Sequence, residues 1–493
     1  MNLPPPPLPT TTRHTAARLP VLVADLGSAT PAFLSPEDLA CWRQDLDARL
    51  ARLQQHPEQG LGFIEEHVRQ CTLELQRHIV QRAMQAKADA VEEHCPGCQT
   101  ALIEKKRRVP KTIQSYCGAV QLYRTHGWCK TCEAWVFPAD TALGLGEHST
   151  ASPLVQELCA LLVSKMPCEQ AEPVSARVAG IPFSRSTLAR EAQRQGERAI
   201  QKRQEQIPSP LQGPAPSVPR AVGMDRPPPP STLVIQIDAW NIRERDHWGE
   251  TPALRRRGED PQRWHWVYTA TCFRLEQRCR KGKRRAVITE RSYVATREGV
   301  EAMMRQLHAE AMRRGLACAQ RVLVIADGAV WIWNAVHDRF SEAAQRLDLF
   351  HGNAYLWAVA NEIHGTDSSA ARQWVKPLLR QLRQDQVAQV IGRLEELTPR
   401  LHAAAAQAAT KAVEYYTRNQ ARMKYVAGHK RGEPLGSGAI ESTCRQMQCR
   451  MKRGGQFWSR AGDEALLCLE IFWRNDRWEL LFPHVAITAG SRN

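Results

Sequence analysis

The 493-residue sequence predicts a multidomain protein of the α/β class, and three observations lead to this prediction. The chain exceeds the ~250–300 residues beyond which a single hydrophobic core stops growing. Its composition changes along its length, since two CxxC pairs precede a Pro-dense stretch at 207–231 and strand-like apolar runs follow it. Those runs alternate with helical patterns, which is typical of an α/β core. We therefore expect smaller N-terminal domains followed by one larger α/β domain.

The net charge indicates a polyanionic partner. Lys and Arg outnumber Asp and Glu by 67 to 51, giving a formal charge of +16 at pH 7. Each phosphate that such side chains neutralise releases condensed counterions, so the excess favours nucleic acid. No apolar run approaches the ~18 residues of a membrane span, and the N-terminus has no secretory pattern. We therefore expect a cytoplasmic protein with no membrane partner, whose 15 Cys are reduced thiols, closely spaced pairs among them serving as metal ligands.

The first 91 residues divide into a tail and two helices. Residues 1–32 are rich in Pro and Thr and are expected to be disordered. Residues 33–91 contain two helical stretches, at about 36–56 and 60–91. The second stretch carries an apolar stripe at helical spacing, made of Phe63, Ile64, Val68, Cys71, Leu75, Ile79 and Met84. The stripe can pack on the other helix, on a partner subunit or on DNA, and the sequence alone leaves this choice open.

Residues 92–148 contain the two Cys pairs. Cys95 and Cys98 form one CxxC and Cys129 and Cys132 form the other, with 30 residues between them. Four thiolates at this spacing can close a tetrahedral Zn²⁺ site, because each CxxC turn presents two sulfurs to one ion. The gap exceeds the usual ~15–20 residues, and the alternative is two unrelated pairs of buried thiols. We predict a zinc ribbon with a structural Zn²⁺.

Residues 149–206 have a helix-turn-helix-like pattern. One helix is expected to end at Gly180, and Ser184 or Ser186 can cap the next. In that arrangement the second helix enters the major groove and brings three arginines to DNA, namely Arg185, Arg190 and Arg194. The alternative is a plain pair of helices with a charged outer face.

Beyond the Pro-rich linker the element order predicts an RNase H-like core. Three successive strands are followed by helix, strand, helix and strand, the order of an RNase H-like α/β fold. The expected strands are 232–240, 266–276, 286–296, 321–327 and 346–350, with helices at about 297–315 and 330–343. We expect the core to begin with 232–352, an all-helical segment at 353–430, further core helices within 431–480 and a tail at 481–493.

Two acidic residues end apolar strands, and a third begins a helix. Asp238 follows TLVIQI, Asp327 follows VLVIA, and Glu441 lies in the first turn after a Gly-containing segment. A buried strand-end carboxylate costs desolvation free energy unless a cation or a donor receives it. Phosphodiester chemistry uses two Mg²⁺ or Mn²⁺ ions roughly 3.5–4 Å apart, held by hard oxygen ligands. Asp238 would bridge both ions, with Asp327 and Glu441 each completing one coordination shell. Taken singly, each acid can instead be a cap of a strand or helix.

Several motifs in the second half carry a family resemblance. IDAWNIRERD, VLVIADGAVWIWN, LDLFHGN and PLGSGAIESTCRQMQCRMKRGGQFWS occur in this order, after PADTALGL beside the Cys pairs. Together they resemble bacterial insertion-sequence transposases of the Kra type, relatives of the Mutator-like and 256-type DDE transposases, over roughly residues 90–475. The resemblance implies that Asp238, Asp327 and Glu441 are the DDE triad and that 353–430 is a helical insertion in the core. Asp348 and His351 correspond to a DxxH motif, whose histidine contacts the scissile phosphate or orders the metal site; a turn-capping role is the alternative.

The resemblance also implies an activity and partners. The expected activity is metal-dependent cleavage and strand transfer at insertion-sequence ends, at the nucleoid of a bacterial cytoplasm. The expected partners are double-stranded DNA, as terminal inverted repeats and target, and further copies of the chain in a homodimer or larger assembly. Basic residues on the helix of Glu441 are expected to draw phosphate toward the metals, namely Arg445, Arg450, Lys452 and Arg453. The alternatives are another RNase H-like nuclease and a non-catalytic DNA-binding regulator derived from a transposase.

Overall fold

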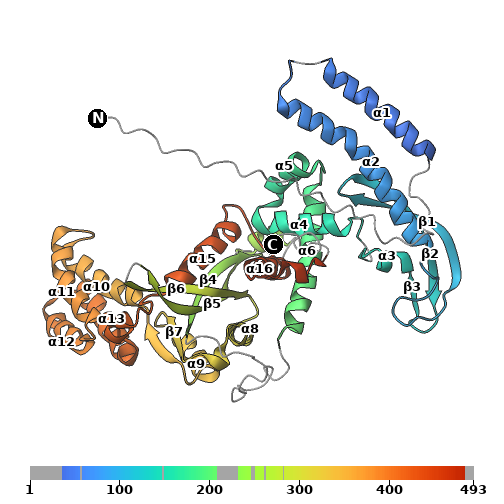
Figure 1. Ribbon diagram of the computed structural model, residues 1–493. Coiled ribbons are helices and arrows are strands. Elements are labelled where there is room, and N and C mark those ends of the chain that lie inside the picture. Colours follow the sequence, from blue (N-terminus) through green and yellow to red (C-terminus); the bar gives the residue numbers. More distant parts are fainter. Residues whose placement is uncertain are drawn as a thin grey trace. The chain divides into compact units, whose positions relative to one another are not determined.

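The computed structural model describes residues 36–55, 58–146, 149–207, 231–245, 250–259, 263–280 and 283–483. The expected tail at 1–32, nearly all of the Pro-rich linker and the last ten residues of the chain lie outside these ranges. The chain divides into two units, Met1–Thr150 and Ala151–Asn493. Each unit combines helices with one β-sheet, so the α/β class predicted from the sequence is confirmed (Figure 1).

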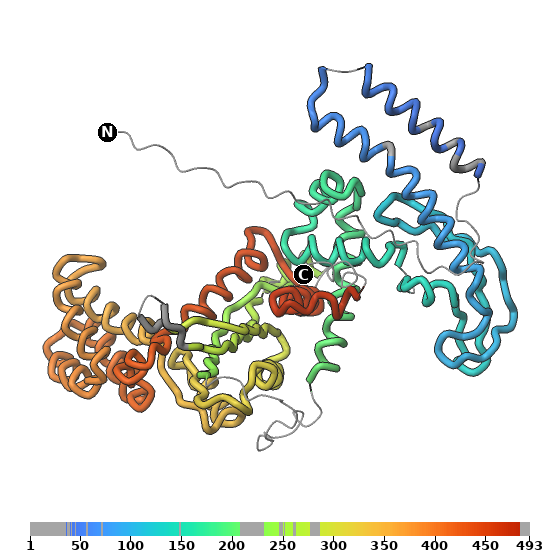
Figure 2. The backbone as a smooth tube through the Cα atoms, in the orientation of Figure 1, coloured from blue at the N-terminus to red at the C-terminus, as the bar shows by residue number. Residues whose placement is uncertain are grey.

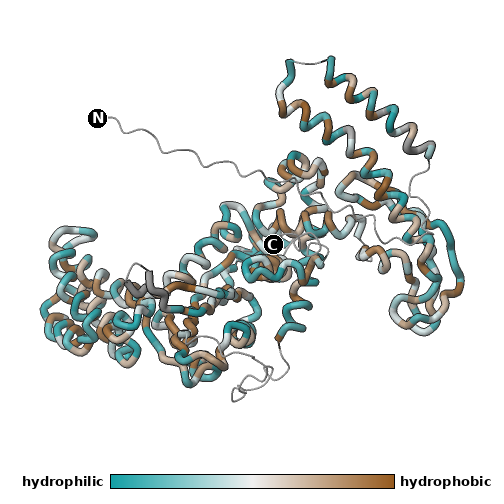
Figure 3. Tube along the Cα trace, in the orientation of Figure 1, coloured by the Kyte–Doolittle hydropathy of each residue, from teal (hydrophilic) through white to brown (hydrophobic). Residues whose placement is uncertain are grey.

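The first unit begins with two helices, and apolar residues at the start of the second helix are exposed. α1 covers Pro36–Gln54 and α2 covers Leu61–Asp89, and an ion pair of 3.3 Å joins Arg49 to Glu74 between them. No described side chain of α1, or of α2 before Ala88, is buried. Apolar positions recur along α2 (Figure 3), and Leu61, Ile64 and Val68 are 68%, 42% and 43% exposed. The start of α2 is therefore exposed, whereas Met84 near its end packs against the small core of the sheet.

A three-stranded antiparallel sheet completes the first unit. Its elements are β1 (Ile103–Ser115), β2 (Gly118–Cys129), β3 (Ala134–Val136) and the short helix α3 (Pro138–Ala142). Ile113, Val120 and Leu122 are fully buried in a small core beneath α2 and α3. Two glutamines one turn apart on α2 bond to the part of β2 that the short β3 does not reach. Gln81 accepts from the amide of Gln121, and Gln85 bonds to both the amide and the carbonyl of Tyr123. The end of α2 is thereby fixed to the sheet.

The second unit is built on a five-stranded mixed sheet. The strands are β4 (Thr232–Glu244), β5 (Arg263–Arg280), β6 (Lys283–Thr296), β7 (Arg321–Ala326) and β8 (Ala344–Leu347). They lie in the order β6-β5-β4-β7-β8. β4, β5 and β6 are antiparallel neighbours, whereas β7 runs parallel to β4 and β8 runs parallel to β7. Ile237 of β4 pairs with Ala326, which pairs with Leu347, so these three strands are in register at one level.

One face of this sheet is covered by the helices that connect β6 to β7 and β7 to β8. α8 (Val300–Arg313) and α9 (Val330–Arg339) pack on Leu233, Ile235 and Ile237. The same core extends into a group of helices, α10 (Leu349–His364), α11 (Ser369–Arg383), α12 (Val387–Leu397) and α13 (Ala403–Asn419). Figures 1 and 2 show this group, with the short α14 (Val426–Lys430), gathered at one end of the unit.

The opposite face carries the C-terminal helices together with the helices before the linker. These are α4 (Pro153–Lys165), α5 (Cys168–Ala179), α6 (Arg185–Glu205), α15 (Gly438–Met451) and α16 (Arg460–Arg474), and α7 (Thr251–Arg256) lies between β4 and β5. Gly180 ends α5 in a left-handed conformation with φ of 68°, and the Ser184 hydroxyl caps α6 by accepting from the amide of Thr187. α6 then crosses α16 so closely that a Cβ added at Gly196 would lie 2.4 Å from that of Ala465. The helix-turn-helix-like helices are therefore anchored to the core of this unit.

None of the helices in the described ranges is both long and apolar enough to cross a lipid bilayer.

Two glycine substitutions should change stability in opposite directions. Gly196→Ala places a methyl group inside the contact with Ala465 and should destabilise the protein by ~1–3 kcal/mol. Gly392→Ala, within α12, meets no atom within 4 Å and should stabilise it by ~0.5–1 kcal/mol through helix propensity. Thermal and urea unfolding of the full chain would measure both. A Gly196→Ala variant as stable as the parent would contradict the packing of α6 on α16.

Candidate functional site

Three aspartates lie along the edge of the sheet where β7 and β8 end. The prediction that Asp238 ends its strand is wrong, because β4 continues to Glu244. Asp238, Asp327 and Asp348 directly follow Ile237, Ala326 and Leu347, which are paired across β4, β7 and β8. Adjacent strands are ~4.8 Å apart, so the three residues form a row. The amide of Asp348 donates to the carbonyl of Ala326 at 2.8 Å, which continues the pairing past the ends of the strands. Parallel strands thus bring together acids that are up to 110 residues apart in the sequence.

A buried glutamine brings Glu441 to the same edge. Gln236 of β4 donates to the carbonyl of Gly436 at 3.1 Å and accepts from the amide of Ile440 at 3.0 Å. Its side chain therefore holds the first turn of α15 against β4. Gln236 is two residues before Asp238 and its partner Ile440 is directly before Glu441, so the contact brings the two acids close together. An added Cβ at Gly436 would lie 2.5 Å from the ring of Phe350, so a larger residue at this turn would displace that exposed ring. Nothing in the sequence pattern singled out Gln236, since its position in a buried strand predicts only burial.

Asp348 is fully buried and is saturated with hydrogen bonds. It caps α10 by accepting from the amide of His351 at 2.8 Å, and it accepts from both the amide and the hydroxyl of Ser437. Burial acts to raise the pKa of Asp348, but hydrogen bonds from His351 and Ser437 outweigh it and lower the pKa to about 2. The Ser437 hydroxyl also lies 2.8 Å from a carboxylate oxygen of Glu441. Asp348 therefore caps α10 and positions the neighbouring groups.

Asp348, His351 and Glu441 form a set of groups that can hold a metal ion. One ligand atom from each lies within 4.8 Å of the others. The His351 Nδ1 atom is 3.4 Å from an oxygen of Asp348 and 3.9 Å from one of Glu441. The hydrogen bond with Asp348 raises the pKa of His351 to about 9, and the charges of Asp327 and Glu441 add to the effect. Since a ligating imidazole must be neutral, a cation at this position would have to displace the proton.

Asp238 and Asp327 lie beside this set without belonging to it. Burial raises the pKa of Asp238, and the nearby charge of Asp327 raises it further, so the two carboxylates sense each other. Asp238 accepts from the amide of Ala239 at 2.7 Å, and the thiol of Cys444 also bonds to it. Asp327 accepts from the amide of Ala329 at 2.9 Å. These carboxylates, with the 38% exposed side chain of Glu441, offer the hard oxygen ligands that suit Mg²⁺ or Mn²⁺.

The four cysteines of the first unit form a second candidate metal centre. One sulfur from each of Cys95, Cys98, Cys129 and Cys132 lies within 4.8 Å of the others. The Cys95–Cys132 and Cys98–Cys129 sulfur distances are 3.8 and 3.4 Å. A tetrahedral site with Zn–S bonds of ~2.3 Å has sulfurs about 3.8 Å apart, so the cluster can bind Zn²⁺. A hydrogen bond with Thr100 lowers the pKa of Cys98 to about 6, which favours the thiolate.

The arginines predicted to contact DNA from α6 are on its accessible side. Arg185 and Arg190 are exposed, and Arg194 is half-buried. Arg185 pairs with Glu172 at 2.9 Å and Arg194 with the buried Glu191 at 2.8 Å. These pairs reduce the charge that α6 presents to a partner. Contact with DNA stays a prediction for all three.

The basic residues of α15 and its end differ from one another in their surroundings. Arg445 is exposed, whereas Arg450 is half-buried and donates twice to the carbonyl of Val163, at 3.1 and 2.7 Å. Burial lowers the pKa of Arg450 to about 10. Lys452 donates to Asn241 at 2.7 Å, and Arg453 donates to Gln170 at 3.0 Å. The structure thus shows Arg450 as a brace between α15 and α4, a contact between distant segments that the sequence could not reveal.

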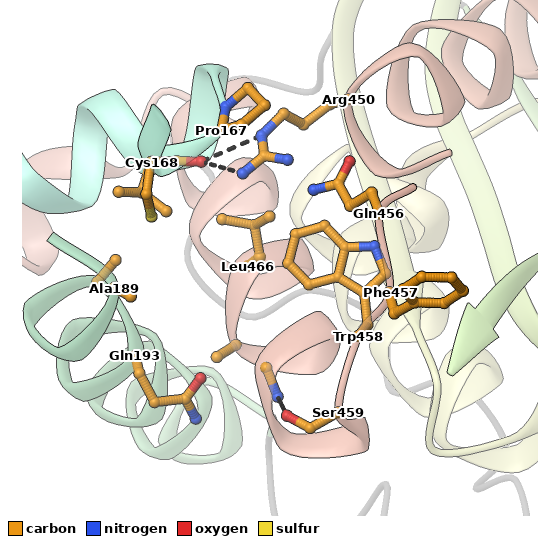
Figure 4. Close-up of a pocket in the computed structure, with 14 residues that line it drawn as sticks. Pro167, Cys168, Ala189, Gln193, Arg450, Gln456, Phe457, Trp458, Ser459 and Leu466 are labelled. Carbon is orange, nitrogen blue, oxygen red and sulfur yellow. Dashed lines mark hydrogen bonds between the residues drawn. The ribbon is translucent and has the colours of Figure 1, made fainter. Parts of the chain in front are cut away.

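A cavity of about 380 Å³ lies between α5, α6, α16 and the segment before α16. None of the acidic residues described above lines it. Figure 4 shows Arg450 and Gln456 at its rim and the ring of Trp458 facing it, while the ring of Phe457 points away. Arg450 is held by Val163, and the indole of Trp458 donates to the carbonyl of Met451 at 2.8 Å. The polar groups at this cavity are thus engaged in holding the helices together.

Comparisons with known proteins do not assign a family. No protein-family model matches the chain, and no curated protein matches it. Among solved structures, the chain is similar to one in a Drosophila P element transposase strand transfer complex, at 11% sequence identity. The match covers 68% of this chain and 81% of the other, with a TM-score of 0.23. A likeness this weak does not establish a shared fold.

The zinc centre can be tested by metal analysis. We expect about one tightly bound Zn²⁺ per chain, and Cys98→Ser or Cys129→Ser should remove it, because three thiolates no longer close the tetrahedron. Cys117→Ser is the matched control, since that thiol lies outside the cluster and contacts Gln76. Elemental analysis of each purified variant gives the metal content. A parent protein without zinc, or equal zinc in all variants, would exclude this assignment.

Proposed function

We propose that this chain is a DDE-type transposase that cuts and joins the DNA ends of a bacterial insertion sequence. The observation that carries the proposal is the gathering of acids at one sheet edge. Asp238 and Asp327 follow paired residues of neighbouring parallel strands, and Gln236 holds the helix of Glu441 against the first strand. The resemblance to Kra-type transposases points to the same three residues.

The sheet supports an RNase H-like core. Three antiparallel strands are followed by β7 and β8, both in the direction of β4, with α8 and α9 leading into them. This is the element order that an RNase H-like fold requires. The helices from α10 to α14 then lie between β8 and α15, where the family resemblance implies a helical insertion.

The three acids have distinct roles in the proposed chemistry. Two divalent ions, when bound, activate the attacking water or 3′-hydroxyl and stabilise the leaving oxygen. Asp238 lies on the central strand and would bind both ions, whereas Asp327 and Glu441 would each bind one. Asp348 does not need to be a ligand, because it already accepts hydrogen bonds from His351 and Ser437 and so positions both. His351 orders Glu441 through their 3.9 Å contact and lies close enough to the acids to meet a bound phosphate.

The DNA partner is supported by charge. The chain carries a formal charge of +16, and the exposed Arg185, Arg190 and Arg445 lie on helices that cover the same face of the sheet. Double-stranded DNA with terminal inverted repeats is the proposed substrate, and a second duplex is the proposed target.

Replacing one catalytic acid should separate binding from cleavage. Asp327→Asn removes a negative charge from the metal-binding edge, so Mg²⁺- or Mn²⁺-dependent nicking of the element's ends should fall by at least about 100-fold while binding is retained. Asp338→Asn is the matched control, since Asp338 is exposed at the end of α9. Nicking of labelled end-repeat duplexes and gel-shift binding would be measured for both.

The outcomes distinguish the alternatives. Unchanged nicking by Asp327→Asn would exclude the assigned triad. Nicking by the parent without strand transfer would favour another RNase H-like nuclease. Specific binding by the parent without nicking in either metal would favour a non-catalytic regulator.

An oligomer is supported by the apolar residues at the start of α2, where Leu61, Ile64 and Val68 are exposed. Leu61, Ile64, Val68, Cys71 and Leu75 are spaced by three and four residues alternately, the pattern of a coiled-coil seam. Residues 36–79 hold eight acidic and five basic side chains, hence a net charge of −3 in a chain of +16. An acidic apolar hairpin is a poor DNA ligand, so a second copy of the same hairpin is the proposed partner.

Charges placed in this seam should weaken self-association. Ile64→Glu combined with Val68→Glu would bury like charges between copies, so the mass in solution should shift toward the monomer by light scattering. Gln59→Glu combined with Gln70→Glu adds the same charge at exposed polar positions and should leave the mass unchanged. A parent that is monomeric at micromolar concentration, or equal masses for both variants, would contradict the proposal.

A further inference from the structure

The start of β5 presents a row of aromatic side chains on one face of the sheet. Trp264, Trp266 and Tyr268 alternate along the strand, and alternate residues of a strand share a face. Trp264 and Trp266 are 57% and 54% exposed, whereas Tyr268 packs edge-on against Trp331 at 5.3 Å. Large aromatic groups left exposed side by side on a folded surface indicate a binding site.

The residues across the strand pair are polar and cationic. Arg243 pairs with Trp264 and Asn241 pairs with Trp266, so both lie on the same face as the tryptophans. The guanidinium of Arg243 lies 5.5 Å from the centre of the Trp264 ring, and the ammonium of Lys452 lies 5.4 Å from it. Lys452 also donates to Asn241 at 2.7 Å. Positive charge thus surrounds the exposed ring of Trp264.

Phe457 extends this surface from the segment before α16. Its ring centre lies 5.2 Å from the guanidinium of Arg243 and 4.6 Å from that of Arg245. The backbone beside it is fixed to β4, because Trp458 donates to the carbonyl of Arg243 at 3.2 Å and accepts from the amide of Arg245 at 2.9 Å. Figure 4 shows the Phe457 ring on the side away from the cavity. The surface is therefore built on rigid backbone from two parts of the chain.

The surface begins beside the level of the acidic edge, on the other face of the sheet. Asp238 of β4 pairs with Thr269 of β5, so Tyr268 is the residue of β5 next to the position of Asp238. At ~3.3 Å per residue, Trp266 and Trp264 follow at about 10 and 17 Å along the strand. A few nucleotides span this distance. Because residues alternate between the two faces, Asp238 and Thr269 lie on the opposite face from the two rings. A strand held at the acids would reach the rings around the side of β4 beyond Ile237, where the pairing of β4 with β7 ends.

We propose that Trp264, Trp266 and Phe457 form a stacking platform for unpaired DNA bases next to the cleavage site, with Arg243 and Lys452 binding the adjoining phosphates. This inference rests on the proposed function, because cleavage at a DNA end is what would supply the unpaired strand. An aromatic face stacks on any base that has left the duplex, whereas bases within a duplex are covered by their neighbours. The expected ligand is therefore a short single-stranded flank at a DNA end, without a strong sequence preference.

Binding of matched oligonucleotides by the full chain tests the platform. The ligands are a labelled end-repeat duplex with a four-nucleotide unpaired flank and the same duplex with a blunt end, measured by fluorescence anisotropy in Ca²⁺ to prevent cleavage. Trp264→Ala and Trp266→Ala should each weaken binding of the flanked duplex by about 5- to 100-fold and leave blunt-duplex binding unchanged. Trp264→Phe should retain most of the affinity, because it keeps a stacking face. Trp473→Ala, at a 42% exposed position on α16, is the control.

Each outcome supports or overturns the platform independently of catalysis. A flank-specific loss confined to the two alanine variants supports it, even in a chain that nicks no DNA. Equal loss on blunt and flanked duplexes, no loss on either, or a change of mass in solution in the alanine variants would overturn it. The converse result is nicking that depends on Asp327 together with tryptophan variants that bind the flanked duplex like the parent. That result would support the proposed function and overturn the platform.

Discussion

The candidate active site depends on one buried amide. Gln236 is 1% exposed, and both ends of its side chain are used, one by the Gly436 carbonyl and the other by the Ile440 amide. Because an unpaired buried amide costs about 1–3 kcal/mol, β4 and the start of α15 are held in a single relative register. Two further contacts secure the same loop, since Asp348 accepts from Ser437 and Arg346 donates to the carbonyl of Pro434 at 2.9 Å. Segments about 200 residues apart thereby present Asp238 and Glu441 to the same space.

The electrostatics of this edge favour a cation. Several carboxylates lie close together in a partly buried position, and burial together with the charge of Asp327 raises the pKa of Asp238. Asp348 is the exception, because its donors stabilise its negative charge and lower its pKa. The proton on His351 partly balances the remaining acids. Divalent ions would balance them more fully, and the aromatic surface of β5 on the other face of the sheet carries positive charge suited to the phosphates of a bound strand.

The sequence was informative where a function needs a local pattern. The end of β7 before Asp327, the CxxC pairs and the Ser184 cap depend on residues close together in the chain, so each could be recognised from spacing alone. Asp238 was expected to end its strand, but β4 continues to Glu244 through pairing with β5, which no local pattern marks. Gln236, the bond of Arg450 to Val163 and the packing of Gly196 on Ala465 join segments that are far apart in sequence, so no local pattern marks them. The exposure of Trp264 and Trp266 could not be foreseen for a related reason: it depends on where the helices covering the sheet end. The helix-turn-helix-like segment shows the same limit, since its caps were predictable and its anchoring to α16 was not.

The central claim is that Asp238, Asp327 and Glu441 jointly bind divalent ions. A crystal of the full chain soaked in Mn²⁺ and measured at the manganese absorption edge would locate such ions directly. We expect anomalous peaks between these carboxylates, two of them about 4 Å apart when a DNA end is bound. Saturating Mn²⁺ with no peak at this edge, or with the three side chains directed into separate environments, would contradict it.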